Sequence, residues 1–248
     1  MTAGTMLDTN VPVTTTYLRS VNVAGLVAVS RPLFGGATDA NGNVPQPVAT
    51  PVTAGEVAAI HAAGLAFLPY ANNYGYGDLL GDAAVAQRKV AEIVAACEAL
   101  GMPAGCYFAH DFETWSTSEA FFDAVLAATG ASQYAGVGVC YGSLGVPGDG
   151  SWRDTLTAMQ RAGNAHANRA VQWLAAYGNN DLSGYVVNGE ILLPALPNWA
   201  GASTFGWQAL GSVEVGALAV DLSVLRLPVL AVGSEGLWLA DGSVGSPK

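Results

Sequence analysis

The strongest constraint on the fold is a regular alternation between short apolar segments and longer segments with helical spacing. This alternation is typical of βα units, whose strands form a parallel sheet. The expected strands end at Asp8 and cover 24–31, 65–70, 105–110, 134–141, 170–177, 203–209 and 216–221. About eight strands match a closed parallel barrel. The sequence therefore predicts an α/β fold, namely a TIM-like (β/α)8 barrel that is either regular or irregular.

Length and composition agree with one domain. The chain has 248 residues, 51% of them hydrophobic and 11% charged, which is enough apolar surface for a large core. The barrel is expected over residues 1–225. Over 226–248 the apolar sequence is broken by Gly and Pro, so this part is expected to be a C-terminal tail or a linker. The stretch 34–51, rich in Gly, Asn and Pro, is expected to be a surface loop.

Two features bear on location. No apolar run approaches the roughly 18 residues that a membrane span requires. The N-terminus lacks the basic region and apolar segment of a secretory signal. We therefore expect no membrane partner and no signal peptide. The protein is then cytoplasmic when made, and it either stays there or leaves by another route, such as assembly into a virion.

Charge and cysteine content exclude further function classes. The net charge is -10 with only nine Lys and Arg residues, so the clustered cations that bind nucleic acid are missing. Cys97, Cys106 and Cys140 lie in apolar contexts and are expected to be buried free thiols. No Cys/His spacing resembles a zinc site, and we expect neither a metal nor another cofactor.

Asp111 and Glu113 follow the apolar run 105–110 and are separated by one residue. On an extended strand, side chains two positions apart leave the same face, so both carboxyls project together while Phe112 points away. Adjacent acids repel each other, so one of them holds its proton more tightly. A proton donor beside a carboxylate is what glycosidic bond cleavage uses. The alternative is that both acids solvate the strand end or cap the next helix.

Two further acids end predicted strands. Asp8 closes the first strand and Asp221 closes the last. In an α/β barrel the C-terminal ends of the strands open on one rim. Asp8 and Asp221 should therefore be neighbours across the barrel seam, on the same rim as Asp111 and Glu113.

Several segments carry a family resemblance over about residues 5–225. They are 6–9 (MLDT), 25–31 (GLVAVSR), 53–65, 99–105, 110–113 (HDFE), 136–142, 205–208 (FGWQ) and 219–222 (AVDL). With these segments the chain resembles the glycoside hydrolase family 25 superfamily, whose best-known members are muramidases. More closely, it is similar to the glycoside-hydrolase-like branch of unassigned activity found in actinobacteria and their phages.

The resemblance implies roles for the four acids. Glu113 would be the general acid. Asp111 would be its electrostatic partner, or would stabilise the positively charged transition state. Asp8 and Asp221 would flank the cleft, orient the sugar and tune Glu113.

Candidate substrate-binding residues lie at or near predicted strand ends, where barrel sites are built. Tyr70, Tyr141 and Trp207 offer rings that stack on sugars, although such aromatics also fill cores. Asn72 offers hydrogen bonds to sugar hydroxyls, but Asn is also ordinary turn chemistry. Arg31 is expected to pair with an acid on the rim, and a simple surface ion pair is the alternative.

Two functions follow from these residues. The first is hydrolysis of bacterial cell-wall glycan, of the peptidoglycan muramidase type, by carboxylate acid catalysis. The second is a non-catalytic barrel that binds glycan or serves as a structural module of a phage tail or cell-surface assembly. A fold does not fix function, and a barrel can keep its acids without turnover. Whether the protein is an enzyme is therefore left open at this point.

Overall fold

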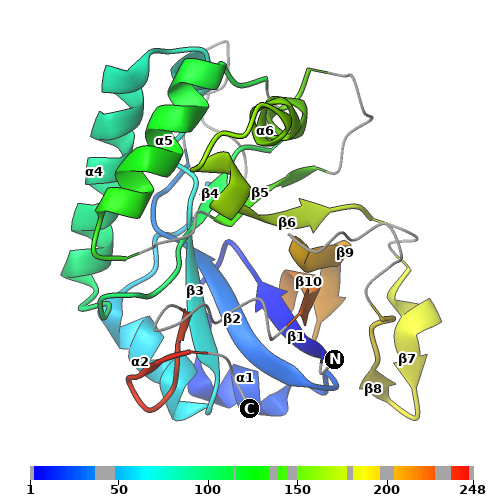
Figure 1. Cartoon of the computed structure of the whole chain (residues 1–248). Helices are drawn as coiled ribbons and strands as arrows, with labels where there is room; N and C mark the ends of the chain where they lie inside the picture. Colours follow the sequence, from blue (N-terminus) through cyan, green and yellow to red (C-terminus); the bar gives the residue numbers. More distant parts are fainter. Residues whose placement is uncertain are drawn as a thin grey trace.

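The computed structural model describes residues 3–36, 48–113, 116–134, 139–143, 150–177, 181–195, 204–226 and 236–245 (Figure 1). Its centre is a closed barrel with the strand order β3-β2-β1-β10-β9-β6-β5-β4, in which β4 pairs back to β3. The barrel strands are β1 (Ala3–Asp8), β2 (Leu26–Pro32), β3 (Ala66–Ala71), β4 (Ala109–Asp111), β5 (Val139–Ser143), β6 (Val171–Ala175), β9 (Thr204–Val215) and β10 (Leu218–Arg226). The predicted α/β barrel is confirmed.

Helices follow most strands and cover the outside of the barrel. They are α1 (Thr15–Ser20), α2 (Ala54–Ala62), α3 (Tyr76–Leu79), α4 (Ala83–Ala99), α5 (Glu119–Ala131) and α6 (Trp152–Arg161), with 3-10 turns η1 (Ala167–Arg169) and η2 (Leu182–Tyr185). Figure 1 shows α4 and α5 packed side by side on the outer face. None of the helices within the described ranges combines the length and apolar character that crossing a bilayer demands.

Helix α4 illustrates how the sequence sets these elements. The Asp82 carboxylate accepts hydrogen bonds from the amides of Ala84 and Val85, at 3.0 and 3.1 Å, and so caps the helix start. The helix ends at Leu100, before Gly101 at φ 76°. Its inner face buries residues at helical spacing, namely Ala86, Val90, Ile93 and Cys97.

The barrel is not parallel throughout, and this corrects the sequence-based expectation. Strand β10 runs antiparallel to both β9 and β1, whereas the other neighbouring pairs in the barrel are parallel. Only residues 216–217 connect β9 to β10, and Gly216 has φ 63°. A two-residue connection makes a hairpin and cannot form a parallel crossover. Asp221 therefore lies in the first half of β10 instead of closing a parallel strand.

Two apolar layers hold the barrel. Its interior is filled by Met6, Leu68, Tyr107, Val139, Trp173, Phe205 and Leu225, all nearly or fully buried. A larger layer between the strands and the helices includes Leu7, Val29, Phe67, Phe112, Phe122 and Trp152. Successive residues of a strand alternate between the two layers, which is why the strands read as continuous apolar runs.

The segment 236–245 completes one side of the barrel. Strand β11 (Leu237–Trp238) pairs with β3 at Phe67 and with β12 (Val244–Gly245). The Gly236 amide donates to the Gly105 carbonyl, at 3.0 Å, and the Gly236 carbonyl accepts from the Tyr107 amide, at 2.8 Å. The segment thus lies between β3 and residues 105–107, where β4 has not yet begun. The rest of the predicted tail, 227–235 and 246–248, lies outside the described residues, as does most of the predicted loop 34–51.

Candidate active site

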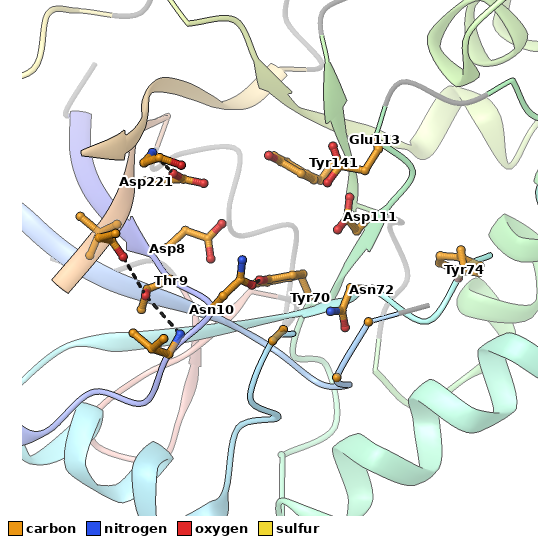
Figure 2. Close-up of a pocket in the computed structure, with 17 residues that line it drawn as sticks. Asp8, Thr9, Asn10, Tyr70, Asn72, Tyr74, Asp111, Glu113, Tyr141 and Asp221 are labelled. Carbon is orange, nitrogen blue, oxygen red and sulfur yellow. Dashed lines mark hydrogen bonds between the residues drawn. The ribbon is translucent and has the colours of Figure 1, made fainter. Parts of the chain in front are cut away.

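A pocket of about 320 Å³ opens at the barrel end where β1, β3 and β4 finish (Figure 2). Figure 2 shows Asp8 and Asp221 on one side of this pocket and Asp111 and Glu113 on the other. The pocket is lined by Asp8, Thr9, Asn10, Val11, Gly35, Gly36, Ala49, Tyr70, Asn72, Tyr74, Asp111, Glu113, Tyr141, Ser212, Ala219, Val220 and Asp221. Among these residues none is Lys or Arg, so the lining carries acidic groups without a cation.

Asp8 and Asp221 face each other directly across the antiparallel β1–β10 pair. Asp8 is 6% exposed. Burial is the main reason why the pKa of Asp8 stands well above its usual range, and repulsion by Asp221 adds to it. The pKa of Asp221 is also raised by burial, although its carboxylate accepts hydrogen bonds from the Ser212 amide, at 2.5 Å, and from Gln208 Nε2, at 2.6 Å. The two acids therefore share one poorly solvated corner.

Asp111 and Glu113 form a second, interacting pair. Burial, followed by repulsion from Glu113 and Asp8, holds the pKa of Asp111 well above its usual range. The pKa of Glu113 is raised by desolvation in the pocket and by Asp221, while a hydrogen bond with Asp111 acts in the opposite direction. Both pKa values are thus raised, chiefly by desolvation, so this pair keeps a proton to a higher pH than an isolated carboxyl would.

The backbone at Glu113 differs from the expected extended strand. β4 ends at Asp111, and Glu113 has φ 51°, in the left-handed region. Phe112 does point away from the pocket, into the layer beneath the helices, as the alternation predicts. Both carboxyls reach the same pocket, but Glu113 does so through a turn.

Two carboxyl oxygens beside the pocket have no hydrogen-bond partner within the part of the chain that the structure describes. Asp8 Oδ1 and Asp111 Oδ1 are buried from solvent and accept no hydrogen bond from the described residues. Buried oxygens of this kind are costly unless something satisfies them. Their isolation agrees with the raised pKa values of both carboxyls, because a protonated carboxyl carries no uncompensated charge.

Three of the predicted substrate-binding residues line the pocket, together with unpredicted ones. The Tyr70 hydroxyl donates to Asn10 Oδ1, at 2.6 Å, and Asn72 Oδ1 accepts from the Phe34 amide, at 3.2 Å. Tyr141 donates its hydroxyl proton to Gln208 Oε1. Asn10 also lines the pocket, and its position two residues after the strand end at Asp8 would have allowed this to be predicted from the sequence.

Gln208 is the most informative residue that the sequence did not single out. It is fully buried, and its amide group links three groups at the pocket. Its oxygen accepts from the hydroxyls of Tyr141 and Tyr177, and its nitrogen donates to Asp221. This arrangement fixes the orientation of the amide. A buried glutamine in an apolar strand was the available signal, because such a group requires partners.

Trp207 and Arg31 do not line the described pocket. The Trp207 indole N–H donates to the Ala176 carbonyl, at 2.9 Å. Arg31 is fully buried; its Nε lies 2.6 Å from Glu56 Oε1, and its other nitrogens donate to the carbonyls of Thr9 and Thr50. The acid that Arg31 pairs with is thus in helix α2 and not on the rim. Its charge still lowers the pKa of Asp8, against the larger effect of burial.

The same ion pair shapes the start of helix α2 at Thr53. The Thr53 hydroxyl accepts from the Glu56 amide, at 3.2 Å, as a capping box predicts. The Glu56 carboxylate does not turn back to the cap, because it binds Arg31 and the Val13 amide, at 2.9 Å. Arg31 binds the Thr9 carbonyl and Glu56 binds the Val13 amide, so the two side chains together hold the segment that follows Asp8 and β1.

His110 lies behind the pocket in a chain of hydrogen bonds whose directions are fixed. The Thr129 hydroxyl donates to the Val125 carbonyl, at 2.7 Å, so it accepts from His110 Nε2–H, at 2.9 Å. His110 Nδ1 then accepts from the Tyr74 hydroxyl, at 2.6 Å. Burial lowers the pKa of His110 to about 3. The ring is therefore neutral and ties β4 to α5.

The described residues contain no group of three or more His, Cys, Asp or Glu side chains arranged to hold a metal ion. The acids of the pocket lie on two sides of it, Asp8 and Asp221 on one side and Asp111 and Glu113 on the other. Acid–base chemistry by the carboxyls themselves is the chemistry that this arrangement supports.

Comparison by sequence identifies no relative, because neither a protein-family model nor a curated protein matches the chain. Comparison of structures finds proteins of similar fold. An uncharacterized protein of B. stearothermophilus superimposes with a TM-score of 0.68 at 18% identity, over 92% of this chain and 98% of that one. GHIP, a glycosyl hydrolase 25 of Streptococcus pneumoniae, gives 0.55 at 11% identity, over 90% and 87%.

A third similar structure is the modular autolysin LytC of Streptococcus pneumoniae, solved with a synthetic peptidoglycan ligand. It gives a TM-score of 0.53 at 15% identity, over 90% of this chain and 46% of LytC. At such identities a likeness shows the fold alone. The chain therefore shares the barrel fold of these three proteins.

Proposed function

We propose that this protein is a glycoside hydrolase that cleaves bacterial cell-wall glycan, of the peptidoglycan muramidase type. The observation that carries the proposal is the convergence of four acids, from β1, from β4 and the turn after it, and from β10, on one pocket without a cationic side chain. The fold shared with LytC and GHIP supports the choice of glycan.

The acid pair supplies the proton. The pKa values of Asp111 and Glu113 are both raised, chiefly by desolvation, so this pair is suited to keep one proton near neutral pH. Glu113 is the more exposed of the two and faces the pocket, so we assign it the transfer to the glycosidic oxygen. Asp111 remains behind it and stabilises the charge that develops on the sugar.

Asp8 and Asp221 act on the other side of the sugar. Glycosidic cleavage passes through a state with positive charge on the ring, which nearby carboxylates stabilise. Both Asp8 and Asp221 line the pocket, so their carboxyls lie beside a sugar ring held there. Tyr70, Asn72 and Tyr141 complete the wall against which the ring would lie.

The test is release of new reducing ends from purified cell wall, comparing the protein with its Glu113→Gln variant. Hydrolysis that is lost in the variant, while the variant keeps its fold and its glycan binding, supports the proposal. Equal release by both proteins refutes it. Tight glycan binding without products in either protein selects the alternative, a non-catalytic glycan-binding or structural barrel.

A further inference from the structure

Glu113 has an unusual backbone conformation for a residue with a side chain. Its φ of 51° lies in the left-handed region, where the Cβ of a non-glycine residue crowds the backbone. Such a conformation persists only where surrounding contacts enforce it, and such sites often carry function. The contacts that enforce it here can be identified.

The Glu113 carbonyl is held by two donors. It accepts from the Ser143 amide, at 3.0 Å, and from the Trp152 indole Nε1–H, also at 3.0 Å. One donor belongs to the end of β5 and the other to the first residue of α6. Two elements that follow Glu113 in the sequence therefore fix the direction of its peptide group.

Gly142 makes room for this arrangement. A Cβ at this position would lie 2.3 Å from the Glu113 carbonyl oxygen and 2.4 Å from Trp152 Nε1. Real side chains essentially never approach backbone atoms so closely, and the backbone oxygen cannot rotate away. Any residue other than glycine at 142 would therefore push apart the carbonyl and the indole.

Trp152 also supports the residue between the two acids. It is fully buried, and its ring packs against Phe112, at a centroid distance of 6.1 Å, and against Phe122, at 6.5 Å. The Phe112 amide in turn donates to the Tyr141 carbonyl, at 3.0 Å. Movement of Trp152 would consequently be transmitted to the peptide groups on both sides of Phe112.

We propose that Trp152 is a positioning residue for Glu113, and that Trp152, Gly142 and the Ser143 amide form a clamp that turns the Glu113 carboxyl into the pocket beside Asp111. The importance of the clamp for hydrolysis rests on the function proposed above. Its effect on the position of Glu113 does not, and can be measured in the absence of any substrate.

The primary experiment is a pH titration of the glutamate carboxyl carbons by NMR, with Glu113→Gln identifying the Glu113 resonance. Trp152→Phe keeps an aromatic ring but removes the N–H. Trp207→Phe is the matched control, because it removes an indole N–H donor to a backbone carbonyl outside the pocket. We expect the Glu113 midpoint to move down toward the ordinary glutamate range in Trp152→Phe and to stay unchanged in Trp207→Phe.

Two further measurements keep the test decisive if Trp152→Phe folds poorly. Gly142→Ala places a Cβ between the Glu113 carbonyl and the Trp152 indole, so it should disrupt the same clamp. It should therefore shift the titration midpoint of Glu113 in the same direction as Trp152→Phe. In the unaltered protein, the indole N–H resonance of Trp152 should follow the titration of Glu113, whereas that of Trp207 should not.

The kinetic arm separates this inference from the proposed function. If the protein hydrolyses cell wall, Trp152→Phe should lower kcat about 10- to 100-fold with little change in KM, because a small misplacement of a catalytic group has effects of this size. If the unaltered protein releases no products, the proposed function fails while the titration still decides the clamp. Two results would overturn the proposed clamp. One is a Glu113 titration midpoint that is unchanged in the folded variants Trp152→Phe and Gly142→Ala. The other is a Trp152 indole N–H resonance that does not shift as Glu113 titrates.

Discussion

Acidification should destabilise the protein through His110, and the size of the effect follows from its burial. The pKa of His110 is about 3 in the folded state, against about 6.5 for an exposed histidine. Between these values the unfolded chain binds one more proton than the folded one. The stability that neutral His110 contributes is therefore complete above about pH 6.5 and is lost as the pH falls toward 3, at about 1.4 kcal/mol per pH unit.

The perturbation that isolates this effect is His110→Gln, which cannot become charged. At pH 7 the variant should be less stable by about 1–3 kcal/mol, because Tyr74 or Thr129 loses a buried partner. Between pH 7 and pH 4 the original protein loses about 3 kcal/mol that the variant keeps. The difference in stability should therefore shrink to near zero or reverse.

The assay is denaturant unfolding of both proteins at several pH values between 7 and 4. The pocket acids titrate in both proteins, so their contribution cancels in the comparison. A difference in unfolding free energy that stays constant over this range would refute the argument, because it would mean that His110 is already charged, or already solvated, in the folded state.

Three further predictions concern the buried acids and their partners. Asp111→Asn should raise the unfolding free energy at pH 7 by about 0.5–2 kcal/mol, and the gain should vanish below about pH 4, where the carboxyl is protonated in both the folded and the unfolded chain; thermal unfolding at both pH values checks this. If the protein hydrolyses cell wall, the pH profile of kcat/KM should keep its activity to a higher pH than an ordinary glutamate allows, because the pKa of Glu113 is raised, and a profile that falls in the ordinary range would contradict this raised pKa. Arg31→Met should cost about 3–5 kcal/mol in denaturant unfolding, and adding Glu56→Leu should recover part of it, since the single change leaves a buried charge unpaired.

The barrel and most of the candidate site could be predicted because both depend on local patterns. Apolar runs alternating with helical segments define the strands, and residues at strand ends must meet at one rim. This is why Asp8 and Asp221, although distant in sequence, were expected as neighbours and are paired in register. It is also why Tyr70, Asn72 and Tyr141 line the pocket as expected. The catalytic roles of the acids remain predictions.

The errors have specific physical causes. The direction of β10 depends on where a hairpin turns, and Gly216 was assigned to a strand instead of to the turn. The hydrogen bond from the Trp152 indole to the Glu113 carbonyl could not be predicted, because a single indole N–H leaves no signal in an apolar pattern. The partner of Arg31 could not be found from its neighbours, because Glu56 comes from a helix that begins only after a long intervening loop.

The β1–β10 seam also has a consequence for biosynthesis. The Thr9 hydroxyl donates a hydrogen bond to the Ala219 carbonyl, which joins residues 210 positions apart. Gly236, which is further along the chain, bonds to Gly105 and Tyr107. On the ribosome, β1 must wait until β10 has been synthesised before it meets this partner. We expect the four acids to be brought together only after that point, with slow folding as the result of such distant pairing. A chain terminated before Asp221 would then lack one wall of the pocket, whatever reaction the pocket supports.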